Sequence, residues 1–238
     1  FYFTFAVTGL SLSAGLAIAS AAIGPRGLEA PAVLQLRSRL ERAGVPCLDV
    51  TEGVLDAASP VRAPSGLVAI ASQPSWSVAQ ALTGPAPLAV VLAGVQDPGN
   101  VGAIIRAAEA SSATGVVAAG ATADPFGWKA LRGSMGSAFR LPVAREPAWS
   151  EVRRHARERG LSLAGLVPRG GVSLYAADLT PPLLLVAGAE GAGVPPEVLA
   201  DLDLRLSIPM PPSVESLNVA VAVGVTLFEA GRQRRSAP

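Results

Sequence analysis

The sequence predicts an α/β protein, in which a parallel sheet covered by helices follows a smaller α/β unit. Three observations support this prediction. Past residue 87, short apolar segments alternate with polar or amphipathic ones, which is the rhythm of strand–helix units. Several of the apolar segments are continuous, as in strands that are buried on both faces. The 238 residues are 50% hydrophobic and 16% charged, which excludes a disordered chain.

Residues 1–72 are expected to form the smaller unit. Apolar side chains at Val33, Leu36, Leu40 and Ala43 recur at helical spacing, and Gly44 ends that helix. Residues 73–87 are rich in proline and glycine and predict a linker. The other elements expected before the linker are strands at 3–9, 17–24, 46–51 and 66–71, and a helix at 52–58.

Residues 88–238 are expected to form the larger unit. The final apolar segment is ambiguous, because residues 219–227 alternate as a strand does, whereas the small residues between the valines also suit a buried helix. The expected strands are 88–95, 115–119, 141–144, 161–167, 183–187 and 204–209, and the expected helices are 101–111, 124–133 and 149–159.

The composition excludes several kinds of site. The single cysteine, Cys47, permits no intrachain disulfide and favours a reducing cytoplasm, and one histidine leaves no Cys/His zinc site, so no metal is expected. His155 lies on a charged helical face and does not suit a catalytic triad. The only lysine, Lys129, follows Trp128 and not glycine, which excludes a Walker A loop. Polar residues and glycines interrupt the uncharged first 25 residues, so we expect no membrane span.

Three loops that follow predicted strands are candidate ligand sites, because ligands bind at the carboxyl ends of strands in open α/β sheets. In the first loop, Asn100 can cap the next helix, and Arg106 lies in an otherwise apolar helix where it needs an anionic partner. Glu109, three residues further on, is the ordinary candidate for that partner, and spacing alone does not decide between the two roles of Arg106.

The second loop contains Gly188, Gly191 and Gly193, which let a ligand approach the backbone. Their spacing is not that of the dinucleotide-binding fingerprint. The third loop, residues 208–218, is rich in proline.

Taken together, the three loops resemble the SpoU/TrmH branch of the SPOUT RNA ribose 2′-O-methyltransferases. Residues 97–106, 188–193 and 208–220 match that family's three motifs in order, and residues 123–136 match the segment between the first two. The resemblance covers about residues 88–234. More weakly, residues 1–72 resemble the ribosomal-protein-like α/β domain of many rRNA-directed members, although residues 10–16 form a shorter connection than in those relatives.

The resemblance implies a trefoil knot near the carboxyl end, a final segment that is helical, and a homodimer that binds RNA across both protomers. It implies that S-adenosylmethionine binds at Gly188, Ile208, Leu217 and Asn218, so we expect Gly188→Val to block the cofactor. The reaction implied is methylation of a ribose 2′-hydroxyl, with 23S rRNA favoured. The alternatives are tRNA and a non-catalytic RNA-binding protein that keeps the knot.

The resemblance also assigns roles to individual side chains. Arg106 acts on the ribose hydroxyl, and we expect it to bind phosphate and stabilise the developing alkoxide, because a free guanidinium is a poor base. Asn100 and Ser216 orient the RNA or Arg106, and Glu190 holds neighbouring loops or the arginine. Asn218 completes the catalytic set, whose presence argues against a non-catalytic protein. The candidate RNA-binding cations are Lys129 and Arg132 in the larger unit and Arg37, Arg39 and Arg42 in the smaller.

Overall fold

The computed structural model describes residues 2–4, 15–59 and 66–236 and divides the chain into two compact units, Phe1–Pro74 and Ser75–Pro238. Most of the strand expected at residues 3–9 lies outside the described residues. None of the helices in the described ranges is both long and apolar enough to cross a bilayer.

The first unit is a four-stranded sheet in the order β1-β4-β2-β3. Helix α3 packs Val33, Leu36 and Leu40 against Ala21 and Ile23 of the sheet to form its core. The elements are strands β1 (Tyr2–Thr4), β2 (Ile18–Ile23), β3 (Cys47–Asp49) and β4 (Leu67–Ala71), and helices α2 (Pro25–Leu28), α3 (Pro31–Arg42) and α4 (Glu52–Ala58).

The second unit is a seven-stranded sheet in the order β7-β6-β5-β10-β8-β11-β9, and all of its pairings are parallel. Strands β5 and β10 are buried at every residue, as their apolar sequences predict. The strands are β5 (Leu88–Ala93), β6 (Gly115–Ala119), β7 (Val143–Arg145), β8 (Ser162–Leu166), β9 (Val172–Ser173), β10 (Leu183–Gly188) and β11 (Leu204–Ser207).

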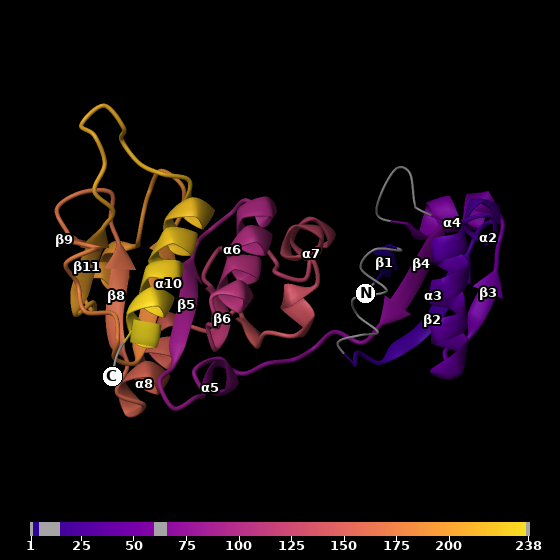
Figure 1. Cartoon of the computed structure of the whole chain (residues 1–238), viewed down its shortest axis with the longest axis horizontal. Helices are drawn as coiled ribbons and strands as arrows, with labels where there is room; N and C mark the ends of the chain where they lie inside the picture. Colours follow the sequence, from indigo (N-terminus) through magenta and orange to yellow (C-terminus); the bar gives the residue numbers. More distant parts are fainter. Residues whose placement is uncertain (1, 5–14, 60–65, 237–238) are drawn as a thin grey trace. The chain divides into compact units, whose positions relative to one another are not determined.

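Helices cover both faces of this sheet. On one face, α5, α8 and α9 share a core with β5, β6, β8 and β10. On the other face, α6 lies between α7 and α10 (Figure 1). The helices are α5 (Val78–Ala81), α6 (Pro98–Ala110), α7 (Trp128–Ser134), α8 (Trp149–Glu158), α9 (Pro196–Leu199) and α10 (Val219–Ser236), and a 3-10 turn covers Ser137–Phe139.

Two expectations change, and one ambiguity is resolved as the resemblance implied. The predicted linker contains α5, which Ser77 and Gln80 begin with reciprocal capping bonds, and whose Val78 and Ala81 are buried in the core of the second unit. The helix expected at 124–133 begins only at Trp128, because residues 124–127 form a turn. The ambiguous final segment is the helix α10. Strand β9 and helix α9 were not predicted.

Candidate active site

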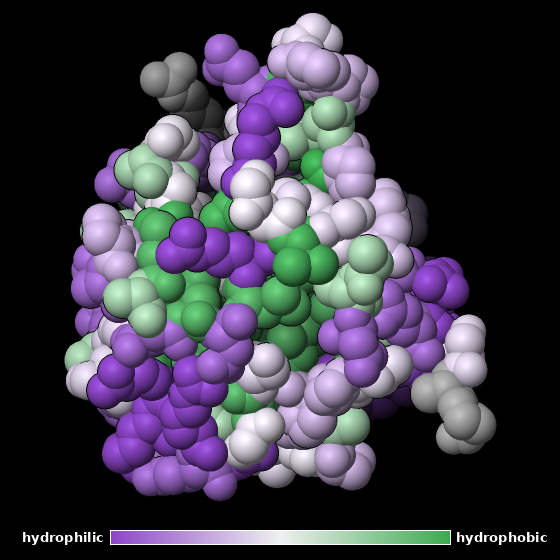
Figure 2. All heavy atoms as spheres, turned by 90° about the vertical axis from the view of Figure 1, so that its left-hand side faces the viewer, coloured by the Kyte–Doolittle hydropathy of each residue, from purple (hydrophilic) through white to green (hydrophobic). Residues whose placement is uncertain are grey.

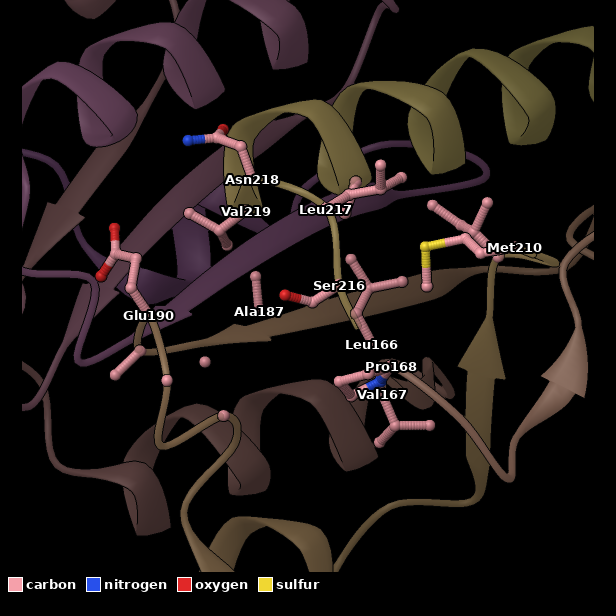
Figure 3. A pocket seen from close by; sticks show the side chains of 16 residues that line it. Leu166, Val167, Pro168, Ala187, Glu190, Met210, Ser216, Leu217, Asn218 and Val219 are labelled. Atoms are coloured by element: carbon pink, nitrogen blue, oxygen red, sulfur yellow. The ribbon is translucent and has the colours of Figure 1, made fainter. Parts of the chain in front are cut away.

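A pocket of about 340 Å³ opens beyond the carboxyl ends of β8, β10 and β11 (Figure 3). Its size lies within the range of small-molecule sites, and its place follows the rule for parallel sheets. All four predicted cofactor residues line it. The lining residues are Leu166, Val167 and Pro168 at the end of β8 and just after it; Ala187, Gly188, Ala189, Glu190, Gly191 and Gly193 at the end of β10 and just after it; Ile208, Met210, Ser216, Leu217 and Asn218 between β11 and α10; and Val219 and Ala222 at the start of α10.

The turn after β10 folds back on itself at Gly188. Ala189 and Gly193 exchange backbone hydrogen bonds of 3.0 and 2.9 Å, which brings Gly193 directly over Gly188. A Cβ on Gly188 would lie only 2.0 Å from the carbonyl carbon of Gly193 and 2.2 Å from the nitrogen of Val194. Any side chain at Gly188 therefore collides with the protein's own backbone. Gly188→Val would distort the turn, so it is not the selective block of ligand binding that the sequence suggested.

A chain of side-chain hydrogen bonds joins the three candidate loops. Asn100 on α6 donates its amide nitrogen to the Glu190 carboxylate at 2.7 Å, and the Asn100 oxygen accepts from the Asn218 amide at 3.0 Å. The other Glu190 oxygen accepts the backbone N–H of Gln96 at 3.4 Å. The structure thus brings Asn100, Glu190 and Asn218 together at the pocket, although they are up to 118 residues apart.

The groups at the two ends of this series of hydrogen bonds determine which atoms donate and which accept. An ionised carboxylate only accepts hydrogen bonds, so Asn100 must present its amide nitrogen to Glu190. At the other end, the Asn218 oxygen accepts the backbone N–H groups of Ala220 and Val221 at 2.9 and 3.3 Å, which caps α10. Asn100 itself is not a cap, because Asp97 caps α6 and accepts the Asn100 N–H at 2.8 Å.

Arg106 lies apart from these residues. Its side chain is exposed on α6, it does not line the pocket, and it has no hydrogen bond or ion pair to any residue that the structure describes. The pairing with Glu109 is wrong, because Glu109 binds Arg140 through two bonds of 2.6 and 2.7 Å. These bonds to Arg140 lower the pKa of the Glu109 carboxyl. Arg106 is therefore a free surface cation within the described chain.

The pocket combines an apolar wall with a few polar groups. Leu166, Val167, Met210 and Leu217 form much of the wall, and the hydroxyl of Ser216 points into the cavity (Figure 3). Exposed peptide groups of the glycine turn complete it. Such a lining suits a ligand with a flat apolar part and a few polar atoms. Within the described ranges, no group of three or more His, Cys, Asp or Glu residues is placed to hold a metal ion.

Sequence reasoning missed the wall after β8. Residues 166–168 were expected to belong to a buried strand or its end, and they carry no polar group that marks a site. The available signal was positional, because β8 ends at the same sheet edge as β10 and β11. Met210 and Ala222 were missed in the same way, inside segments that were otherwise identified.

The candidate RNA-binding cations differ in what they contact. Lys129 and Arg132 are exposed on α7, where the Lys129 ammonium lies 5.8 Å from the centre of the Trp128 ring. In the first unit, Arg37 binds Glu41 and Asp49 at 2.8 and 2.7 Å, so its charge is already compensated. Arg42 donates its Nε to the carbonyl of Ser38 at 3.1 Å, and Arg39 lies on the same helix.

Comparison with known proteins identifies the family of the chain. The model of the SpoU rRNA Methylase family matches residues 87–228, which is more than half of the chain. The 23S rRNA (guanosine-2′-O-)-methyltransferase RlmB of Xanthomonas campestris pv. campestris is 34% identical over 218 residues, which cover 89% of this chain and 87% of that relative. The uncharacterized tRNA/rRNA methyltransferase slr1673 of Synechocystis sp. is 39% identical over 152 residues, which cover 64% of this chain and 56% of that relative.

A solved structure is also similar over the full chain. The SpoU methyltransferase AviRb from Streptomyces viridochromogenes, crystallised with the cofactor AdoMet, is 30% identical, with a TM-score of 0.87 and coverage of 100% of this chain and 91% of that one. The matched family segment contains all three loops that meet at the pocket. The chain belongs to the SpoU rRNA methylase family.

Proposed function

We propose that this protein transfers a methyl group from S-adenosylmethionine to a ribose 2′-hydroxyl of RNA, with 23S rRNA as the favoured substrate. The observation that carries the proposal is the series of hydrogen bonds among Glu190, Asn100 and Asn218, two of which line a pocket of suitable size. The names of relatives such as RlmB support the choice of rRNA over tRNA.

In this proposal the pocket of the second unit holds the cofactor. Gly188 and Ile208 offer backbone groups, Leu217 offers apolar contact, and Asn218 fixes the start of α10 beside the ligand. When bound, S-adenosylmethionine supplies an electrophilic methyl group on a sulfonium leaving group. The chain's own contribution is to exclude water and to orient the two reactants, which accounts for a large part of the barrier in such transfers.

We propose that the enzyme acts as a homodimer through the outer face of α10. Val221 and Phe228 are 51% and 52% exposed, and with Val225 they follow the i, i+4, i+7 spacing of an apolar helical stripe. Exposed apolar stripes of this kind mark interaction surfaces. Arg106 is exposed on the neighbouring helix and outside its own pocket, so in the dimer we assign it to the pocket of the partner subunit.

The role proposed for Arg106 is electrostatic. A guanidinium stays protonated in proteins and is a poor base, whereas its planar donors suit a phosphate and a developing alkoxide. Asn100 and Ser216 would orient the RNA, and Glu190 would hold the loops together through Asn100. Lys129 and Arg132 would contact phosphates beside the site.

We further propose a trefoil knot in the second unit, a ribosomal-protein-like RNA-binding role for residues 1–72, and a cytoplasmic location. Two features support the knot: β10 is inserted between β5 and β8, and the chain then continues through β11 into a helix that packs on α6.

The test is methyl transfer to 23S rRNA and to tRNA from cells that lack this gene, followed by mass mapping of ribose methylation. Arg106→Ala is expected to lower single-turnover transfer about 100-fold, on the scale of losing one transition-state charge contact, with little change in cofactor affinity. Arg106→Lys should rescue it poorly, because a point charge does not reproduce the planar fork.

Mixed dimers test the assignment across the interface. A protein with Arg106→Ala and a protein with a blocked pocket, such as Leu217→Asp, are each expected to have strongly reduced activity alone. Co-expressed, they should regain part of the activity, because one intact site forms per mixed dimer. Methyl transfer at the wild-type rate by Arg106→Ala would contradict the role proposed for Arg106. A wild-type protein that binds RNA but transfers no methyl group would favour the non-catalytic alternative.

A further inference from the structure

Arg169 ties together two walls of the pocket that come from different parts of the chain. It follows the wall segment 166–168, and its Nη2 donates to the carbonyl oxygens of Pro212 at 3.1 Å and Val214 at 2.8 Å. Those carbonyls belong to the segment between β11 and α10, which we call the proline loop (residues 209–217). A single guanidinium therefore bridges the edges of the pocket formed after β8 and after β11.

The segment that carries Arg169 is fixed to the sheet on both sides. Before it, the Val167 N–H donates to the carbonyl of Leu206 at 2.9 Å. After it, the Ser207 hydroxyl donates to the carbonyl of Gly171 at 3.1 Å. Arg169 thus extends from backbone that is held against β11, and this makes it an anchor.

The proline loop has few other attachments. It rises above the rest of the second unit, and residues 211–217 are exposed (Figures 1 and 2). Its prolines have no N–H to donate, and in the described part of the chain its remaining hydrogen bond is internal, from Val214 to Pro211 at 3.1 Å. Yet this loop supplies Met210, Ser216 and Leu217 to the pocket. Its position therefore depends on Arg169 at its outer part and on Asn218 at its end.

We propose that Arg169 is a positioning residue of the cofactor pocket, which holds the proline loop in place beside the ligand and so sets how long the ligand stays bound. The inference rests on the proposed function for the identity of the ligand. A guanidinium suits this role because it stays charged at all accessible pH values and makes charge-assisted bonds to carbonyl oxygens.

The first test compares Arg169→Ala and Arg169→Lys with the control Arg205→Ala, which removes an exposed arginine of β11 whose side chain has no hydrogen bond or ion pair to the described residues of the loop. Calorimetry with S-adenosylmethionine should show about a tenfold higher Kd for Arg169→Ala, the scale of losing one charge-assisted bond, and an intermediate value for Arg169→Lys. A chase experiment should place most of the change in faster dissociation. Arg205→Ala should match the wild type.

Kinetics separate positioning from a direct role. In Arg169→Ala the KM for the cofactor should rise, while kcat at saturating cofactor and the KM for RNA stay within about twofold of the wild type. A fall in RNA affinity with unchanged cofactor affinity would show that Arg169 is a phosphate contact, and would overturn the proposal. Unchanged values for both would overturn it as well.

Hydrogen exchange of the free protein tests the contact between Arg169 and the proline loop without any ligand. Amides of residues 210–217 should exchange faster in Arg169→Ala than in the wild type and in Arg205→Ala, with the rest of the chain unaffected. If the wild type itself fails to bind S-adenosylmethionine, the proposed function fails, and this measurement alone decides whether Arg169 holds the loop. Equal exchange in all three proteins would reject it.

Discussion

Asn100 is the residue on which the polar edge of the pocket depends, because both ends of its side chain are used. Its amide nitrogen serves Glu190 and its oxygen serves Asn218, so one change breaks the link among all three loops. Aspartate has nearly the same shape as asparagine but has no N–H to donate. The effect of Asn100→Asp therefore reports on the hydrogen bond and not on packing.

Asn100→Asp is expected to lower cofactor affinity about tenfold or more at pH 8, because it places two carboxylates at hydrogen-bond distance. Such a pair raises the pKa of one member, and a shared proton restores a bond between them. Affinity of the variant should therefore recover as the pH falls to 6, as calorimetry at the two pH values would show. Glu190→Gln is the control, since it keeps an oxygen that accepts from Asn100. An Asn100→Asp protein whose affinity equals that of the wild type at pH 8 would contradict this.

At the scale of single elements, the end of α10 is anchored by Arg234. Its guanidinium donates to the carbonyl oxygens of Ala86 at 2.7 Å and Leu179 at 3.0 Å, and also to that of Pro181. Burial lowers the pKa of Arg234. The hydrogen-bond partners named here are backbone carbonyl groups and include no carboxylate. The helix that carries part of the pocket is thus fixed to the segments that lead into β5 and β10.

Arg234→Ala is expected to reduce the free energy of unfolding of the second unit by about 2–4 kcal/mol, because several carbonyl groups lose a charged donor. Urea denaturation followed by circular dichroism would measure it. The matched control is Arg232→Ala on the same helix, where the largely exposed side chain binds, among the residues that the structure describes, only the nearby Glu229. Its loss should cost much less than the loss of Arg234, because exposed ion pairs contribute little to stability. Similar losses in the two variants would show that the anchor contributes little.

The ion pairs and hydrogen bonds that attach α8 make the free energy of unfolding of the second unit depend on pH. Asp203 accepts from Arg157 at 2.6 and 2.9 Å and from the Leu163 N–H at 2.8 Å, and these bonds lower its pKa below the ordinary 3.8. Bonds from Trp149 and Arg153 lower the pKa of Asp201 in the same way. The unfolded chain then takes up protons at a higher pH than the folded one, so the contribution is complete above about pH 5 and is lost as the pH falls below 3.8.

Asp203→Asn should accordingly be clearly less stable than the wild type at pH 6 and much closer to it at pH 3. At pH 3 the carboxylate of the wild type is losing its advantage, whereas the asparagine does not titrate. Urea denaturation at the two pH values gives the comparison. An equal loss of stability at both pH values would mean that the variant acts through packing and not through charge.

How much of each element the sequence predicts depends on what its residues contact. The apolar runs of β5 and β10 are buried on both faces, so their sequence alone identifies them. Helix α10 is ambiguous because Gly224 and neighbouring alanines, which permit close packing on α6, leave the valines in an alternating pattern. In α5 the prolines and Gly84 that follow obscured the capping signal of Ser77 and Gln80.

Residue type and position alone suggested only a capping role for Asn100. Its role at the site, and those of Glu190 and Asn218, came from the resemblance to a known family, and the structure links the three side chains through hydrogen bonds. Their mutual bonds were not predictable, because the bonds depend on which strands become neighbours. Arg169 gave no signal, since an arginine that binds backbone carbonyls has no partner that a sequence pattern can indicate.

At the scale of the whole molecule, the division into two units predicts that the second one functions without the first in cofactor binding. A protein that begins at Ser75 keeps Trp76, which bridges to Ala144, and Ser77, which caps α5. It should bind S-adenosylmethionine with unchanged affinity and stay dimeric. It should lose RNA affinity and show a shallower dependence on salt, because fewer phosphates are neutralised.

Filter binding at two salt concentrations measures that change, with calorimetry and light scattering as controls for folding and assembly. RNA affinity and salt slope equal to those of the full chain would show that residues 1–72 do not contact RNA. A joint loss of cofactor binding and solubility would show that they stabilise the second unit instead.

The place of β10 in the sheet has a consequence for synthesis of the chain. This strand lies between β5 and β8 but is made after both, starting at Leu183, about 90 residues after β5 ends at Ala93. At ribosomal rates of 5–20 residues per second, the inner edge of β5 waits roughly 5–20 s for its partner. Throughout that interval, an apolar strand destined for the centre of the molecule has an open edge of the kind that aggregates. The nascent chain is therefore a natural client for chaperones, and slower translation after residue 93 would lengthen its exposure.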